Sequence, residues 1–145
     1  MNIKIKFGVG FGRIFFGMVP SEVIFILGDP DKVNNNEREG CVVYYYNKLM
    51  TKLFFDLENN NKLITIYVSN QDVYIWDKKV IGMRKTDFES LLDKNEIMLK
   101  VYDDYKIFDS IFCEEIWSVF GFQYDKLTDI EFSVFTDEYN NCVWP

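Results

Sequence analysis

The side chains able to carry chemistry in this sequence are mainly carboxylates and thiols, because the chain contains no histidine. Without an imidazole, the Ser-His-Asp and Cys-His catalytic sets and the HExxH zinc site are excluded, and the commonest general base is absent. The cysteines Cys41, Cys113 and Cys142 show no CxxC spacing, so we predict small buried apolar side chains rather than nucleophiles or zinc ligands. We expect that the protein is not an enzyme and that it has neither a metal site nor a cofactor.

Two carboxylate pairs, Asp103-Asp104 and Glu114-Glu115, are the remaining candidates for acid–base chemistry. Neighbouring residues on a strand point to opposite faces of a sheet, so neither pair is expected to form a dyad. Two interpretations stay open. The acids lie on a solvated face, or they belong to a patch that binds a partner.

Two short motifs resemble ligand-binding loops without having the spacing that such loops need. The glycines of Gly8–Gly12 lack the GxGxxG spacing, and strand-like residues follow them instead of a helix that could hold a phosphate. The stretch Asp29–Asp31 lacks the spacing and the closing glutamate of an EF-hand. We interpret the first motif as a turn and the second as a helix end.

The stretch from Val101 to the end is the strongest candidate for a binding surface. It contains only two basic residues, Lys106 and Lys126, against ten acids, and tyrosines and tryptophans lie between these acids. Aromatic anchors inside a charged rim are typical of protein interfaces. The alternative is that the aromatics are core and the acids are outward strand positions. The predicted partner-binding residues are Tyr102, Asp103, Asp104, Tyr105, Asp109, Glu114, Glu115 and Trp144.

The net charge of -7 is unevenly distributed along the chain. Residues 1–72 carry 8 Lys+Arg and 8 Asp+Glu, whereas residues 73–145 carry 8 and 15. Nucleic acids and anionic membranes need a positive face, so we expect neither as a partner. A basic protein would be attracted to the second half. The plainer interpretation is that the charge only maintains solubility.

Length and cysteine content limit the classes of protein to which this chain could belong. A chain of 145 residues corresponds to about one domain. No apolar run approaches the roughly 20 residues of a membrane span, and no secretory signal is recognisable. An odd number of cysteines without repeated spacing argues against a disulfide framework. We therefore predict a cytoplasmic location.

Two helices are expected to position these residues. Residues 20–27 are predicted to form the first, because Pro20 suits the first helical position and Gly28 ends the helix. Thr86 and Glu89 have the spacing of a capping box and predict the second. The expected apolar faces are Val23, Ile26, Leu27, Phe88, Leu91 and Leu92. The strand candidates are residues 41–46, 49–57, 63–68, 74–76, 97–101, 106–112, 116–122 and 128–135.

Two similarities within the chain predict an internal repeat. Gly17-Met18 and the helix after it recur at Gly82-Met83, an offset of 65 residues. Lys62-Leu63 recurs as Lys126-Leu127, an offset of 64. Two matches in the same order at nearly one offset predict two copies of one unit.

The expected fold class is α+β, a tandem repeat of a helix followed by an antiparallel β-meander, with the helices packed on one face of an antiparallel sheet. Residues 1–145 would form a single domain made of two pseudo-repeats, about 1–72 and 73–145.

The residues from Gly17-Met18 through Leu27-Gly28 to Pro30, followed by strands and Leu63-Ile64, resemble a known module. It is the helix-plus-hairpin unit of the SmpA/OmlA outer-membrane assembly lipoproteins, which occurs in tandem in the β-lactamase-inhibitor proteins. Small bacterial immunity-like proteins also look similar. The second copy has Asp93-Lys94 where the glycine and proline would align, so the motif covers about half of the chain.

This resemblance implies protein binding and no catalysis. We predict an immunity or inhibitor protein that neutralises a basic, nuclease-like toxin by covering its active site with an acidic, aromatic-containing surface. The alternative is a non-catalytic assembly or scaffold protein that forms a homodimer or larger homo-oligomer through edge strands. A third possibility, an enzyme or ligand binder that uses carboxylates and tyrosines, would require a cavity.

Overall fold

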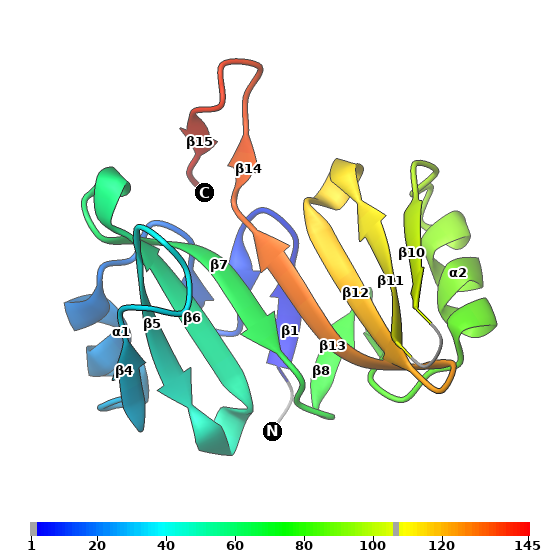
Figure 1. Ribbon diagram of the computed structural model, residues 1–145, viewed down its shortest axis with the longest axis horizontal. Helices are drawn as coiled ribbons and strands as arrows, with labels where there is room; N and C mark the ends of the chain where they lie inside the picture. Colours follow the sequence, from blue (N-terminus) through cyan, green and yellow to red (C-terminus); the bar gives the residue numbers. More distant parts are fainter. Residues whose placement is uncertain (1–2, 106–107) are drawn as a thin grey trace.

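The computed structural model describes residues 3–105 and 108–145, leaving the side chain of Tyr105 aside (Figure 1). Its largest element is an eight-stranded antiparallel sheet in the order β10-β11-β12-β13-β7-β6-β5-β4. At the centre β13 pairs with β7, with Phe132 opposite Ile66. Strands from both halves of the chain therefore form one continuous sheet. The strands are β4 (Lys32–Asn34), β5 (Cys41–Tyr46), β6 (Thr51–Asp56), β7 (Lys62–Val68), β10 (Val101–Tyr105), β11 (Phe108–Cys113), β12 (Ser118–Gln123) and β13 (Lys126–Ser133).

A second sheet of five short strands has the order β3-β2-β1-β8-β9. Its central pair is parallel, with Ile3 of β1 opposite Val73 of β8. The β2–β3 hairpin needs glycine at position 10, where φ is +151° and a Cβ atom would lie 2.9 Å from Cα of Phe15. These strands are β1 (Ile3–Lys6), β2 (Gly10–Phe11), β3 (Ile14–Phe15), β8 (Val73–Ile75) and β9 (Lys78–Lys79). Near the C-terminus β14 (Phe135–Thr136) pairs with β15 (Cys142–Val143).

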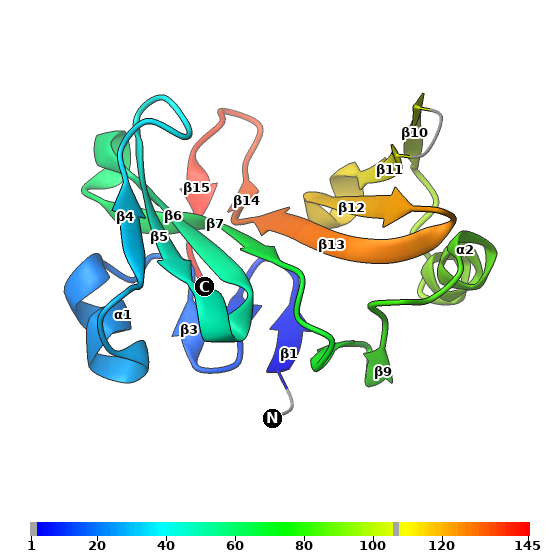
Figure 2. The same cartoon turned by 60° about the horizontal axis from the view of Figure 1, so that its bottom comes forward.

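Figure 2 shows how the layers are stacked. One face of the large sheet is covered at its centre by the small sheet and at its two ends by the helices α1 (Pro20–Leu27) and α2 (Lys85–Lys94). The main hydrophobic core lies between these layers. Fully buried aromatic rings at its centre include Phe55, Phe88, Phe120 and Phe132. The opposite face of the large sheet, which we call the open face, is turned away from this core.

Both helices form where local signals predicted them. Pro20 is at the start of α1, and the Glu22 carboxylate accepts a hydrogen bond from the Val19 N–H at 3.1 Å. Gly28 ends the helix with φ +83°, a left-handed conformation that favours glycine. Helix α2 buries Phe88, Leu91 and Leu92 as predicted. It begins at Lys85, and the expected cap by Thr86 does not form.

Three-residue 3-10 turns end several strands of the large sheet. Turn η1 (Asn47–Leu49) follows β5, η2 (Leu57–Asn59) follows β6, and η3 (Glu114–Ile116) follows β11. Each is followed by a residue in the left-handed region, namely Met50, Asn60 and Trp117. These compact turns keep consecutive strands adjacent and so build the sheet by local pairing.

The predicted fold class is wrong. Of the described residues, 46% are in strands and 19% are in helices, the 3-10 turns included. The structure is therefore mostly β and is not a tandem repeat of a helix and a meander with helices covering the face of one sheet. The layer beneath the large sheet is in large part a second sheet. The sequence indicated turns in the glycine-rich segment 8–12, but the strands around these glycines build that sheet together with β8. Helices of 8 and 10 residues are too short to cover eight strands.

Candidate functional site

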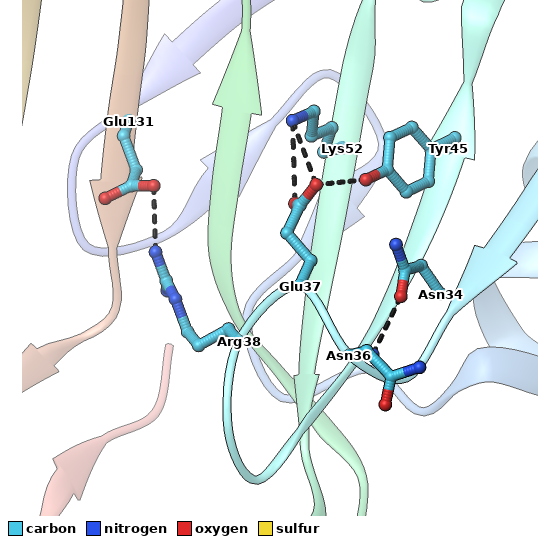
Figure 3. A network of polar contacts seen from close by, with 7 residues as sticks. All are labelled: Asn34, Asn36, Glu37, Arg38, Tyr45, Lys52 and Glu131. Carbon is cyan, nitrogen blue, oxygen red and sulfur yellow. Dashed lines mark hydrogen bonds and ion pairs between the residues drawn. The ribbon is translucent and has the colours of Figure 1, made fainter.

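The open face carries alternate residues of the large sheet, as the pleat of each strand requires. Near its centre the cross-strand neighbours are Lys52, Tyr67 and Glu131. Figure 2 shows that both ends of the large sheet bend toward this side. The loop of residues 35–40, between β4 and β5, lies over one half of the face and makes the contacts drawn in Figure 3.

A polar network fixes this loop on the sheet (Figure 3). The Glu37 carboxylate accepts hydrogen bonds from the Tyr45 hydroxyl and, at 3.3 Å, from the Lys52 ammonium. The Arg38 guanidinium donates to Glu131 Oε1 at 2.9 Å and lies 4.2 Å from the centroid of the Phe54 ring. Two adjacent residues of the loop thus contact different strands: Glu37 bonds β5 and β6, and Arg38 reaches β13.

These contacts shift the pKa values of Glu37 and Tyr45. Partial burial by itself would raise the pKa of Glu37, but the hydrogen bonds from Tyr45 and Lys52 outweigh burial and lower it. The hydrogen bond to Glu37 raises the pKa of Tyr45. Because the charges of this network neutralise one another, we interpret it as a device that positions the loop rather than as a ligand site. No local sequence pattern predicts this network, since Arg38 and Glu131 are 93 residues apart.

Three of the predicted partner-binding residues, Tyr102, Asp104 and Asp109, instead face helix α2. The Tyr102 hydroxyl donates to Glu89 Oε2 at 2.8 Å, and burial together with this bond raises the pKa of Tyr102 to about 12. The ammonium group of Lys85 lies 3.4 Å from Asp104 Oδ1 and also bonds Asp109. Burial would lower the pKa of Lys85, but these carboxylates raise it. This group attaches α2 to β10 and β11.

The other predicted residues are dispersed over the molecule. Glu115 accepts hydrogen bonds from the backbone N–H groups of Met98 and Leu99 at 2.9 and 2.8 Å, so it orders the loop before β10. Glu114 is exposed in η3. Trp144 is half-buried, with the Lys62 ammonium 5.0 Å from its ring.

Asp103 is exposed on the open face, opposite Ser110 on β11. In the part of the chain that the structure describes, it has no ion pair. The side chain of Tyr105 lies outside the described residues, so its predicted role stays a prediction.

Strand β10 and its surroundings form the best candidate surface. Exposed apolar side chains gather there, namely Met98 (66% exposed), Leu99 (63%), Val101 (59%) and Phe108 (53%). The strand is at the margin of the sheet and pairs only with β11 among the described strands. We call these four residues, with Asp103 and Asp104, the β10 edge. Sequence reasoning found the two acids but missed the apolar residues, because exposed and buried apolar strand residues look alike in a sequence.

The structure also contains hollows that none of the predicted residues line. One of about 670 Å³ lies between α1 and the β1–β3 strands, where Phe11, Ile14 and Tyr46 line it together with the charged residues Arg13 and Asp29. Another, of about 850 Å³, includes Met50, Tyr124 and Lys126. Within residues 3–105 and 108–145, no group of three His, Cys, Asp or Glu side chains is arranged to hold a metal ion.

The three cysteines are free thiols. Cys41 and Cys113 are buried, and burial raises the pKa of the Cys113 thiol to about 11. Of the helices among the described residues, neither α1 nor α2 has the length and apolar character needed to cross a membrane.

Comparison with known proteins gives a fold likeness. No protein-family model matches the sequence, and no curated protein matches it either. A 1.5 Å crystal structure of an extracellular protein containing an SCP domain from Bacillus anthracis str. Ames is similar, with a TM-score of 0.54 and 14% sequence identity. The match covers 81% of this chain and 43% of that one, so the chain spans less than half of that protein. At this identity the likeness concerns the fold alone. The resemblance to SmpA/OmlA and inhibitor proteins stays a prediction.

Proposed function

We propose that this protein acts without catalysis by binding a basic protein partner through the β10 edge, in the manner of an immunity or inhibitor protein. The observation that carries the proposal is the set of four exposed apolar side chains on and beside β10, together with the carboxylate of Asp103, which has no ion pair among the described residues. Apolar side chains bordered by charge are typical of interfaces that exclude water on binding.

Charge supports a basic partner. Lys85 forms ion pairs with Asp104 and Asp109, whereas Asp103 has no ion pair among the described residues. The acidic excess of the second half would speed the approach of a positive surface, and salt would weaken that attraction. A cytoplasmic location remains part of this proposal and agrees with three free thiols.

Homo-oligomerisation through edge strands is the second candidate function. The unpaired outer side of β10 favours it, because such an edge can pair with another copy of itself. This candidate predicts a concentration-dependent dimer that forms without a second protein. Sedimentation velocity over a hundredfold range of protein concentration, with wild type and Asp103→Lys, separates it from the first candidate.

The test of the main proposal compares two charge reversals in the full-length protein. Asp103→Lys changes the β10 edge, whereas Glu39→Lys makes the same change of net charge at an exposed residue of the first half. Immobilised wild type is used first to capture partners from the source cells and then to measure binding of each purified partner, and of a panel of basic nuclease domains, at low and high salt.

We expect one partner that binds wild type and Glu39→Lys equally, binds Asp103→Lys about tenfold more weakly, and binds all three less tightly at high salt. A partner that binds Asp103→Lys as tightly as wild type would contradict the β10 edge as the contact surface. Capture of no partner under any condition would overturn the proposal as a whole.

A further inference from the structure

The outer side of β10 offers backbone groups that the described structure leaves unpaired. In an antiparallel pair, alternate residues direct their N–H and C=O groups toward the neighbouring strand, and the others direct them away. Strand β10 pairs with β11 from Val101–Phe112 to Tyr105–Phe108. No described strand lies on its other side. Helix α2 does not fill this place, because Figure 2 shows it beneath the large sheet while β10 forms the upper margin.

The charges on β10 argue against a second copy of this chain as the occupant. Two copies paired antiparallel about a two-fold axis would bring both Asp103 and Asp104 of each copy within a few residues of one another. Like charges at opposed positions of neighbouring strands are destabilising. Natural proteins use charged edge residues to prevent such self-pairing.

Protection against self-pairing does not explain the apolar residues. On the open face Val101 and Phe108 lie on either side of Asp103, since their registers place all three on the same side of the sheet. An edge that only repels copies of itself gains nothing from two side chains that are more than half exposed. A partner strand beside β10 would cover Val101 and place a side chain next to the carboxylate of Asp103.

We infer that the β10 edge binds an extended segment of a basic partner as a ninth strand of the large sheet. This inference rests on the proposed function and names the mode of binding. Backbone hydrogen bonds to β10 supply affinity, and alternate side chains supply selectivity. On the open face the segment presents an apolar residue opposite Val101 and a basic residue opposite Asp103, while Phe108 lies one strand further away, on β11. On the other face a second basic residue meets Asp104, which is only partly neutralised by Lys85.

The experiment uses the full-length, isotope-labelled protein and synthetic peptides of nine residues, blocked at both ends. The first peptide alternates valine and lysine, the second alternates valine and aspartate, and the third contains the first composition in scrambled order. Backbone chemical shifts and amide hydrogen exchange are recorded during titration. The same titrations are made with Asp103→Lys and with the control Glu39→Lys.

We expect the valine–lysine peptide to shift residues 98–105 and 108–113 and to slow exchange of β10 amides at least about fivefold. Asp103→Lys should weaken the peptide's affinity about tenfold, and the loss of a single exposed charge in Asp103→Asn about two- to fivefold. The scrambled and acidic peptides should leave the β10 amides unprotected, and Glu39→Lys should bind as wild type does.

Three results would overturn strand addition. They are the absence of shifts at β10, equal binding of the acidic peptide, and β10 amides already protected in a dimer without peptide. The peptide titration does not depend on a cellular partner, so a failed capture would overturn the proposed function alone. A captured partner that leaves β10 amides unprotected would overturn strand addition alone.

Discussion

At the scale of single residues, Arg38 makes the contacts that join the loop of residues 35–40 to the middle of the large sheet. It contributes an ion pair to Glu131 and a contact over the Phe54 ring (Figure 3). An exposed ion pair contributes about 0.2–1 kcal/mol and a surface cation–π contact about 0.5–1 kcal/mol. We expect Arg38→Ala to lower the free energy of unfolding by about 1 kcal/mol in urea titrations.

Glu131→Gln should cost less than Arg38→Ala, because the ring contact of Arg38 remains. Arg13→Ala is the matched control, since Arg13 is exposed and makes no ion pair among the described residues. An effect of Arg13→Ala as large as that of Arg38→Ala would show that the loop contacts contribute nothing particular.

The same loop predicts a dependence of stability on pH through Glu37. Its pKa is lower in the folded protein than the ordinary value of 4.5. A lowered carboxylate pKa contributes stability above the unfolded pKa, and this contribution is lost as pH falls through the folded pKa. We expect wild type to be more stable than Glu37→Gln at pH 7, and the difference to shrink below pH 4.5.

Unfolding by urea at pH 7, 5, 4 and 3 measures this difference. Glu39→Gln serves as the control, because Glu39 is exposed in the same loop and its side chain makes no hydrogen bond or ion pair among the described residues. A difference between wild type and Glu37→Gln that stays constant from pH 7 to pH 3 would rule out the proposed linkage.

At the scale of elements, the hairpin of β12 and β13 requires a residue without a side chain at position 121, which is glycine. A Cβ atom at Gly121 would lie 2.9 Å from Asp129 Cγ and still closer to its Oδ1. The two residues are cross-strand partners at a register shift, and the Thr128 hydroxyl holds the Asp129 carboxylate at 2.8 Å. Gly121→Ala should therefore destabilise the protein by about 1–3 kcal/mol, as overpacking does.

Asp129→Ala in the same chain should restore most of this loss, because it removes the atoms that the new methyl group contacts. Thermal unfolding of both single variants and the double variant measures the coupling. Additive effects would mean that the cost of Gly121→Ala arises from the backbone and not from Asp129.

The helices could be predicted from the sequence more fully than the strands. Helix positions and their buried residues, such as Val23 and Phe88, followed from apolar spacing and, in the first helix, from Pro20 and Gly28, whereas the predicted Thr86 cap does not form. The strands of the small sheet did not, because two-residue strands such as β2 and β3 are too short to show alternation. The small sheet also depends on the pairing of β1 with β8, which joins residues 70 positions apart, such as Ile3 and Val73.

At the scale of the whole molecule, the two halves of the chain share their sheets. β7 pairs with β13, β1 pairs with β8, and the Phe132 ring contacts Phe7 and Phe16 at centroid distances of 6.2 and 5.7 Å. Separating residues 1–72 from 73–145 would leave these edges unpaired and this core open to water. We expect neither fragment to show cooperative unfolding by circular dichroism, in agreement with the prediction of a single domain.

An equimolar mixture of the two fragments should recover native-like near-ultraviolet circular dichroism, with the intact chain as the reference. Cooperative unfolding of either fragment alone would show that each half carries a sufficient core of its own, contrary to this prediction.

The predicted binding residues show the same division between local and distant information. The sequence identified an acidic, aromatic second half, but the structure turns Tyr102, Asp104 and Asp109 toward α2 and leaves Asp103 on the open face. Strand alternation alone could separate Asp103 from Asp104. Which of the two faces is covered depends on where α2 packs, and nothing in the local pattern of β10 contains that position.

The sequence by itself therefore determined the properties that depend on residue type and short spacing, namely the absence of imidazole chemistry, the acidic second half, the two helices and most strands of the large sheet. Tertiary structure alone decided how the strands are ordered, that a second sheet underlies the first, and that Arg38 reaches Glu131. The physical reason is that helices and turns form from contacts within a few residues, whereas sheet order and the exposed side of an edge strand depend on partners that only the folded chain brings together.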